Sequence, residues 1–408
     1  MRHADDELDA WVRLIHWPGL GRESIRKLLA AFGSVTAVAR APHSARRAVL
    51  GPRAEVSAVP DERHAQQLDV TRAWLNASAS RRLITLGEDD YPAILLHTVD
   101  PPLWLYAEGD ASLLQSEALA IVGSRQATPQ GLQNARAFGR DLAGRGWVIV
   151  SGLAAGIDAA AHEGALEASV GAQTGAGGNT IAVVGTGLDQ VYPRSNRGLA
   201  ARITERGLML SEFPLGTPPI ATHFPLRNRI IATLTRGTLV VEAAAKSGSL
   251  ITARLAAEAG REVFAIPGSI HSPQSRGCHD LLKQGAKLVE TAEDVLEELG
   301  AGVGARPTRL QALANPGTER AAQARSARSP MGSPSSAASD ASGPELDAGT
   351  EPADAVLRVM GHDPSTLDAL MARCGWSAPE LTARLLQLEL AGQVARLPGG
   401  LYQRIRST

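Results

Sequence analysis

Cysteine and aromatic residues are scarce in this chain. Cysteine occurs only at Cys278 and Cys374, far apart in the sequence, which excludes a disulfide framework and a CxxC metal pair. Aromatic residues make up only 4% of the chain, so any stacking of nucleic-acid bases must rely on a few side chains. No apolar run reaches the ~18 residues of a membrane span, and the N-terminal sequence MRHADDELDAWVRL lacks a basic segment followed by an apolar one. We therefore expect a soluble cytoplasmic protein with no membrane partner.

The chain also lacks an excess of charge of either sign. Its 41 Lys and Arg residues nearly balance its 42 Asp and Glu residues, which gives a formal net charge of -1. A globally basic protein is thereby excluded, so binding to nucleic acid would have to depend on a local cluster of cations. The 408 residues suffice for two or three domains with a well-buried central core.

Residues 1–78 are predicted to form a small helical domain. Apolar residues recur at helical spacing from Leu8 to Ile15, and a second apolar face runs from Ile25 to Phe32. Between them, the sequence PGLG at 18–21 breaks the helix. A glycine turn between two short helices is typical of a SAM-like or helix-hairpin-helix domain, whose turn amides can contact DNA phosphates. A plain helical packing module explains the same pattern, and we favour it.

Residues 79–300 alternate apolar strand-like runs with helical segments, which predicts an α/β domain. We expect strands at 118–122, 147–150, 180–185, 208–212, 239–243, 262–266 and 287–290. Their nearly continuous apolar sequences indicate a sheet covered on both faces. The predicted fold is therefore Rossmann-like and doubly wound, with a mostly parallel sheet. Thr128 and Pro129 are predicted as the N-cap and first residue of a helix, and the glycine-rich sequence at 171–179 as a flexible surface loop.

The remaining residues divide into a linker and a small C-terminal domain. Residues 301–350 contain no aromatic residue and no isoleucine, so they are predicted to be a disordered linker. In residues 351–408, three helical segments precede a hairpin near 392–403, a pattern typical of a winged-helix-like module. Such a module binds duplex DNA or docks proteins. Its helix around 377–387 has few basic residues, so we do not expect it to read DNA.

The segment 223–252 concentrates groups that bind anions. The triplet Arg227-Asn228-Arg229 opens an apolar helical run, and Lys246 precedes a Ser-Gly-Ser turn into the next helix. Two earlier loops, GSR at 123–125 and SGLAAG at 151–156, follow strands whose carboxyl ends should meet at one edge of the sheet. Guanidinium, ammonium and helix-start amides together predict a phosphate-binding surface. The predicted phosphate-binding or DNA-binding residues are Gly123, Ser124, Arg125, Ser151, Gly152, Phe224, Arg227, Asn228, Arg229, Lys246, Ser247 and Ser249.

Motifs of familiar enzymes are not found. The chain has no GxxxxGK[ST] P-loop, Gly185-Thr186-Gly187 lacks the third glycine of a dinucleotide fingerprint, and Ser151 is not in a GxSxG elbow. Asp158 and His162 are spaced to form an acid–base pair, but a structural histidine is the better interpretation. Neighbouring Cys278 and His279 supply only two potential ligands, so we predict no metal site, no cofactor and no catalytic residue.

The sequence leaves two interpretations open for Glu242 and for the aromatic residues Phe224 and Tyr192. Glu242 could be a general acid or base, or it could orient Arg227 or Arg229 through a buried ion pair, which we favour. Phe224 and Tyr192 are the plausible stacking platforms, although core packing is the better expectation for either of them. With so few aromatic residues, we expect binding dominated by the phosphate backbone and little dependent on base sequence.

Five strings that occur in order resemble the bacterial DNA-processing protein A family, DprA or Smf. They are AIVGSRQATPQG (120–131), SGLAAGIDAAAHEGAL (151–166), TIAVVGTGLDQVYPRSNRGL (180–199), SEFPLGTPPIATHFPLRNRIIATL (211–234) and VVEAAAKSGSLITARLAAEAGREVFAIPGS (240–269). The resemblance implies a homodimeric single-stranded-DNA-binding protein without known catalytic turnover. Members protect incoming strands in natural transformation and help to load the RecA recombinase.

The resemblance also implies roles for individual positions. Gly123-Ser124-Arg125 matches the family's phosphate-binding loop, residues 227–229 its basic triplet, and Lys246 its lysine before Ser-Gly-Ser. The dimer contact would come from residues 278–286. This chain departs from the family at Gly277-Cys278-His279, where Gly-x-Asn is usual, and in the longer loop at 171–179.

Two functions are therefore weighed. The first is a non-enzymatic DNA-binding recombination mediator. The second is a nucleotide-processing enzyme of the nucleoside-monophosphate glycosidase type, in which Arg125 and Glu242 would hold a phosphate-ribose. The absence of that enzyme class's PGGxGT loop favours the first.

Overall fold

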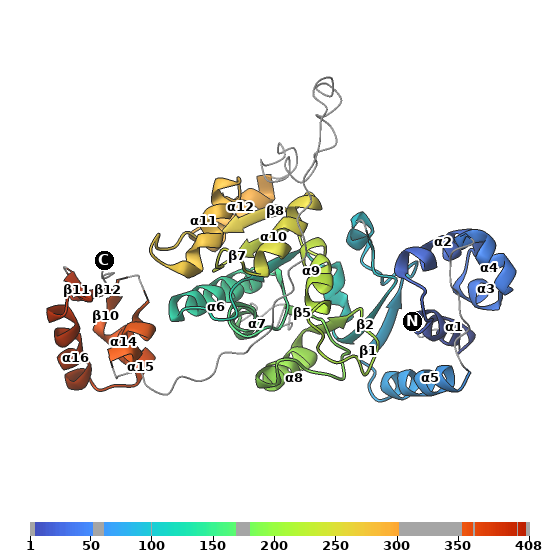
Figure 1. Cartoon of the computed structure of the whole chain (residues 1–408), viewed down its shortest axis with the longest axis horizontal. Coiled ribbons are helices and arrows are strands. Elements are labelled where there is room, and N and C mark those ends of the chain that lie inside the picture. The colour runs from blue at the N-terminus through green and yellow to red at the C-terminus, as the bar shows by residue number, and fades with distance from the viewer. Residues whose placement is uncertain are drawn as a thin grey trace, which may run out of the picture.

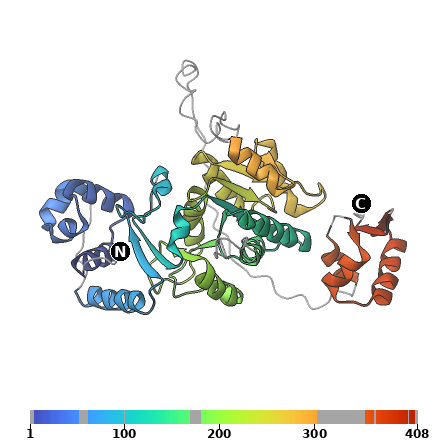
Figure 2. The same cartoon turned by 180° about the vertical axis from the view of Figure 1, so that it is seen from behind.

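The computed structural model of the chain describes residues 5–51, 61–98, 100–168, 180–301, 353–361, 364–397 and 399–404. Figure 1 shows a central α/β domain, with the N-terminal helices on one side and a small C-terminal module on the other, and Figure 2 gives the view from behind. The predicted linker at 301–350, apart from its first residue, and the predicted loop at 171–179 lie outside the described residues. Within the described part, no helix is both long and apolar enough to cross a membrane.

The N-terminal unit is helical, as predicted. Its helices are α1 (Asp5–Ile15), α2 (Arg22–Phe32), α3 (Val35–Arg40), α4 (His43–Leu50) and α5 (Asp61–Asn76). Helix α1 buries Leu8, Trp11, Val12 and Leu14 on one face, because these residues recur with the helical period. Gly33 ends α2 in the left-handed conformation with φ of 80°.

The start of α2 bears on the choice between a DNA-binding hairpin and a packing module. Arg22, the first residue of α2, forms ion pairs with Asp100 and Glu212 of the central domain. This end of the helix therefore packs against carboxylates of the same chain, an environment that disfavours a DNA phosphate. The contact supports the packing interpretation.

The central sheet has nine strands in the order β1-β2-β6-β5-β4-β3-β7-β8-β9. The seven predicted strands are confirmed as β3 (Ala118–Val122), β4 (Val148–Ser151), β5 (Thr180–Val184), β6 (Leu208–Ser211), β7 (Gly237–Val240), β8 (Glu262–Ala265) and β9 (Lys287–Leu288). Two further strands, β1 (Arg81–Thr85) and β2 (Trp104–Gly109), were not predicted and add an antiparallel edge through the pairing of β2 with β6. From β3 the chain builds the sheet first toward β6 and then, from β7, in the opposite direction. The carboxyl ends of β3 and β7 thus form the switch point at which such sheets bind ligands.

Helices cover both faces of this sheet, as predicted. Strand β3 is buried throughout, with Ala118, Ala120 and Val122 on one face and Leu119 and Ile121 on the other. Helices α9 (His223–Thr233), α10 (Ser249–Glu258) and α11 (Arg276–Lys283) pack on the first face, and α6 (Pro129–Gly144), α7 (Ile157–Glu167) and α12 (Ala292–Ala301) on the second. Helix α8 (Arg197–Arg206) packs near β5 and β6. Short 3-10 turns are η1 (Ala93–His97), η2 (Ala111–Gln115), η3 (Arg194–Asn196) and η4 (Pro273–Ser275).

The C-terminal module is a winged helix, as predicted. It contains α14 (Ala353–Met360), β10 (Ser365–Thr366), α15 (Leu367–Cys374), α16 (Ala378–Leu390), β11 (Val394–Leu397) and β12 (Leu401–Arg404). The strands form an antiparallel sheet in the order β10-β12-β11. A capping box between Ser377 and Glu380 starts α16. The module contacts the central domain through Arg373, which donates to Gln130 and Gln133 of α6.

Candidate nucleic-acid interface

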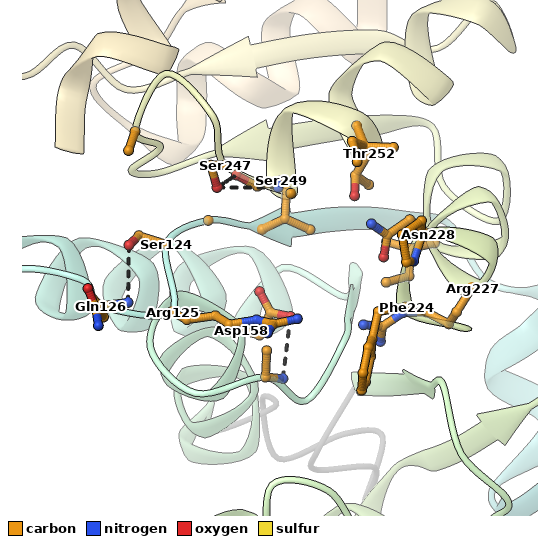
Figure 3. Close-up of a pocket in the computed structure, with 18 of the residues that line it drawn as sticks. Ser124, Arg125, Gln126, Asp158, Phe224, Arg227, Asn228, Ser247, Ser249 and Thr252 are labelled. Atoms are coloured by element: carbon orange, nitrogen blue, oxygen red, sulfur yellow. Dashed lines mark hydrogen bonds between the residues drawn. The ribbon is translucent and has the colours of Figure 1, made fainter. Parts of the chain in front are cut away.

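A cleft of about 860 Å³ lies at the switch point of the sheet. Its walls are the loop after β3, the start of α7, one face of α9, and the segment from Ala244 to Thr252 that follows β7 and enters α10. Figure 3 shows Ser124 and Arg125 on one side, Ser247, Ser249 and Thr252 on another, and Phe224, Arg227 and Asn228 on α9. The structure thus brings together the predicted groups from three separate regions of the sequence.

The loop after β3 is held so that Arg125 is exposed at the cleft. The Ser124 amide donates to the carbonyl oxygen of Glu242 at 2.7 Å, and the Ser124 hydroxyl accepts from the Gln126 amide at 3.1 Å. A Cβ at Gly123 would approach Ile157 to 2.6 Å, so glycine permits the loop to pack on α7. The Arg125 guanidinium lies over the Phe224 ring, 5.4 Å from the ring centroid.

The loop after β4, which was predicted to bind phosphate, makes hydrogen bonds within the protein. Ser151 is fully buried and its hydroxyl donates to the carbonyl oxygen of Ile121 at 2.6 Å. The Gly152 amide donates to Asp158 at 3.1 Å, and the Gly152 carbonyl accepts from Arg227 at 2.8 Å. Neither Ser151 nor Gly152 lines the cleft. Their contacts give both residues a structural role, and DNA binding by them stays a prediction.

The Arg227-Asn228-Arg229 triplet does not act as one basic unit. Asn228 lines the cleft. Arg227 also borders it but is only 5% exposed, and it donates to the carbonyls of Gly152 and Val183. Arg229 does not line the cleft and pairs with Glu212. Successive helical residues point about 100° apart, so three neighbours cannot share one face.

The roles of the acidic residues differ from those expected. Glu212, not Glu242, pairs with Arg229, so the favoured pairing of Glu242 with that arginine is wrong. Glu242 instead accepts from the Thr128 amide at 2.9 Å and from the Thr128 hydroxyl at 2.5 Å, at the start of α6. Thr128 in turn accepts from the Gly131 amide, which confirms it as the N-cap. Glu242 borders a separate, smaller pocket and not the cleft.

Asp158 and His162, which were considered as an acid–base pair, have structural roles. Thr180 donates its one hydroxyl proton to the carbonyl of Ile149, so it must accept a proton from Nδ1 of His162, 2.7 Å away. Burial lowers the pKa of His162 to about 3, with Arg227 acting in the same direction, so the ring is neutral at pH 7. Burial raises the pKa of Asp158, while Arg227 and the amides of Ala154 and Gly152 oppose that shift. The preferred interpretation of His162 as a structural residue is supported.

Lys246 and the turn after it lie on the opposite wall. Lys246 is exposed, and its side chain borders the cleft. The Ser247 and Ser249 hydroxyls are 2.7 Å apart, and the Ser249 amide donates to Ser247 at the start of α10. Among the described residues, no ion pair involves Arg125 or Lys246, so both charges are available to an anion.

Tyr192 lines the cleft but was not among the predicted site residues. It is 43% exposed, and its ring lies 5.6 Å from that of Phe224. The exposed Arg194 follows two residues later, in η3. Core packing was the expectation for Tyr192, and the structure corrects it. Gln126, Thr252 and Gln274 also border the cleft and had no recognisable motif.

No metal site accompanies the cleft within the described ranges, where no group of three or more His, Cys, Asp or Glu side chains converges. Cys278 is buried, with its sulfur 3.7 Å from the carbonyls of Val240 and Val241. His279 instead approaches the carbonyl of Gly268 at 2.9 Å. The two residues are therefore engaged separately, by backbone groups.

Comparison with known proteins identifies the family. Residues 82–300 match the family described as DNA recombination-mediator protein A, and residues 337–400 match the DprA winged helix domain. The chain is 41% identical over 342 residues to protein Smf of Escherichia coli K12, covering 84% of this chain and 82% of that protein. It is 48% identical over 211 residues to DNA processing protein DprA of Streptococcus pneumoniae R6, covering 52% and 72%.

A solved structure is also similar. The X-ray structure of DNA processing protein A from Streptococcus pneumoniae has a TM-score of 0.59 and 38% sequence identity, covering 73% of this chain and 99% of that one. The family match spans the central α/β domain that carries the cleft, and the relative from E. coli extends the similarity over most of the chain. The chain therefore belongs to the DNA recombination-mediator protein A family.

Proposed function

We propose that this protein binds single-stranded DNA in the cleft and acts as a non-enzymatic recombination mediator. The observation that carries the proposal is that Arg125 and Lys246, which form no ion pair within the described part of the chain, border one cleft with the Phe224 and Tyr192 rings. The cations suit backbone phosphates, and the rings suit bases. Bases in a duplex are stacked on one another, so rings at this position favour a single strand.

The wider role follows from the family. The relatives in E. coli and S. pneumoniae are named Smf and DNA processing protein DprA. We extend the proposal to a cytoplasmic homodimer that protects single strands and delivers them to the RecA recombinase, in recombination and, in a host that takes up DNA, in transformation. The buried Arg227 would add positive charge to the cleft wall. The proposed DNA contacts are Gly123, Ser124, Arg125, Phe224, Asn228, Lys246, Ser247 and Ser249.

The glycosidase alternative is less well supported. It requires Arg125 and Glu242 to face one phosphate-ribose. Glu242 is directed to Thr128 and does not line the cleft, and His162 is buried away from it. Release of free base from a nucleoside monophosphate, lost in Glu242→Gln, would revive this alternative.

The test compares the wild-type chain with Arg125→Ala/Lys246→Ala for binding to fluorescent dT oligomers and to a matched duplex. With four phosphates engaged, affinity should fall roughly 50-fold between 50 and 200 mM salt, at ~0.7 counterions per phosphate. The double variant should bind more weakly. Because two phosphate contacts are lost, its slope of log affinity against log salt concentration should be shallower by about 1.4. Arg254→Ala is the matched control, because Arg254 on α10 carries the same charge but pairs with Glu258 outside the cleft. Binding that is insensitive to salt, or unchanged in the double variant, would refute the proposal.

A further inference from the structure

A network of charged side chains joins the N-terminal helices to the central domain. Arg22 of α2 donates from Nε to Asp100 at 2.7 Å and from Nη1 to Glu212 at 3.2 Å. Arg26, one turn later, donates to Asp100 at 2.6 Å. Glu212, just after β6, is also paired with Arg229 of α9. The network therefore runs from α2 through Glu212 to α9.

Helix α9 is the part of the central domain that the network shares with the cleft. Phe224 and Asn228 of this helix line the cleft, and Arg229 follows directly after Asn228. At the helix start, the His223 ring stacks on Phe213 at 4.1 Å with an interplanar angle of 13°. Helix α9 is thus attached at two places to the adjacent residues Glu212 and Phe213. A shift at Glu212 would move the cleft residues of α9 with it.

Burial makes the attachment depend on both arginines. The Glu212 side chain is 3% exposed and that of Arg229 is 12% exposed, whereas that of Arg22 is 26% exposed. Burial raises the pKa of Glu212, and the charges of Arg229 and then Arg22 oppose this shift. A buried carboxylate needs nearby positive charge to offset the free-energy cost of its desolvation. Removing one of its two guanidinium partners therefore leaves much of that cost uncompensated. We then expect the Glu212 side chain to change position, and Arg229 to move with it.

We infer that Arg22 and Glu212 are positioning residues for the DNA cleft, through which the N-terminal helical unit holds α9 in its binding position. This inference rests on the proposed function, because it assigns a role in DNA binding to residues that do not touch the cleft. Neither residue contacts DNA directly in this scheme. The N-terminal unit therefore sets the affinity of a site that lies in another part of the chain.

The test uses the full-length chain and three variants of α2. Arg22→Ala removes the link to Glu212, and Arg22→Lys keeps a charge that can reach one carboxylate. Lys27→Ala is the matched control, because Lys27 lies on the same helix and pairs only with Glu23 on the surface in the described structure. Each variant is measured for dT binding and for hydrogen exchange of the peptide covering residues 223–233 without DNA, with the peptide covering α7 as an internal reference.

In Arg22→Ala we expect faster exchange in α9 but not in α7, and about fivefold weaker dT binding, at the lower end of usual couplings between sites. Arg22→Lys should recover part of both effects, and Lys27→Ala should match the wild type. A purely structural role would lower the melting temperature without changing α9 exchange or dT affinity, and that result would overturn the inference. If the wild type itself fails to bind dT, the proposed function fails, and the exchange data still report separately whether Arg22 orders α9.

Discussion

Arg227 donates from Nη1 to the carbonyl oxygen of Gly152 at 2.8 Å, while the amide of the same glycine donates to Asp158 at 3.1 Å. One glycine is thus held from both sides by a buried pair of opposite charges. Burial lowers the pKa of Arg227 to about 10, with Asp158 opposing the shift, so the guanidinium stays charged at neutral pH. A Cβ at Gly152 would collide with this guanidinium, which explains the requirement for glycine. Arg227 therefore orders the wall of the cleft and also contributes charge to it.

Arg227→Ala should lower both stability and affinity for single strands. The change leaves Asp158 without its buried counter-charge and leaves the carbonyls of Gly152 and Val183 without their donor. The free energy of unfolding should fall by about 3 kcal/mol, as when one partner of a buried pair is removed. Urea denaturation and dT binding measure the two effects. Lys246→Ala is the comparison, because it should weaken binding alone. A fully stable Arg227→Ala protein would show that the loop does not need this donor.

The basic triplet shows which part of the site can be predicted from the sequence and which part cannot. The triplet correctly predicted that α9 contributes to the site, because Asn228 on this helix lines the cleft. Arg229 was expected to bind phosphate, but its partner Glu212 lies at the end of a strand that no local pattern connects to it. Which helical face meets which carboxylate depends on tertiary packing. The helical period already indicates that only one or two of three neighbours can face a ligand.

In the central sheet, too, the features that depend on tertiary packing could not be predicted from local sequence. The parallel strands were predictable because each is a short, buried, apolar run between helical segments. Strands β1 and β2 were missed because their pairing depends on distant partners: β2 lies between β1 and β6, and Tyr106 is in register with Ser211. Conversely, the Thr128-Pro129 cap and the wing of the C-terminal module depend on neighbouring residues, and the sequence predicted both correctly.

Arg229→Ala should lower stability as well as the affinity for single strands, because Arg229 compensates the buried Glu212 carboxylate and links it to α9. It leaves Glu212, which is 3% exposed, with Arg22 as its remaining ion-pair partner among the described residues. We expect the free energy of unfolding to fall by about 3 kcal/mol in urea titrations. Arg229→Met/Glu212→Leu should recover most of the loss, because an apolar pair needs no charge compensation. Equal loss in the single and double variants would indicate that packing, not charge, determines the effect.

His162 should make stability fall as the pH is lowered below neutrality. Its pKa is about 3 in the folded protein, because of burial, and near 6.5 when unfolded, so between these values the unfolded chain binds more protons. The contribution is complete above pH 6.5 and declines by up to about 1.4 kcal/mol per pH unit below it. Urea midpoints at pH 7.5, 6 and 5 measure the slope. His162→Gln, which cannot take up the proton, should have a shallower slope than the wild type, and an unchanged slope would contradict the assignment.

Removal of residues 302–408 should leave the affinity for dT within about twofold of the full chain. Three arginines of the winged helix are engaged within it or with α6: Arg404 donates to the Leu357 carbonyl, Arg384 to Gln387, and Arg373 to Gln130 and Gln133. Helix α16 instead exposes Leu386 and Leu390, at 55% and 82%, which suits a protein surface better than a DNA groove. Binding to dT and duplex, measured side by side for both chains, tests this. A loss of tenfold or more for either ligand on truncation would make the winged helix part of the DNA site.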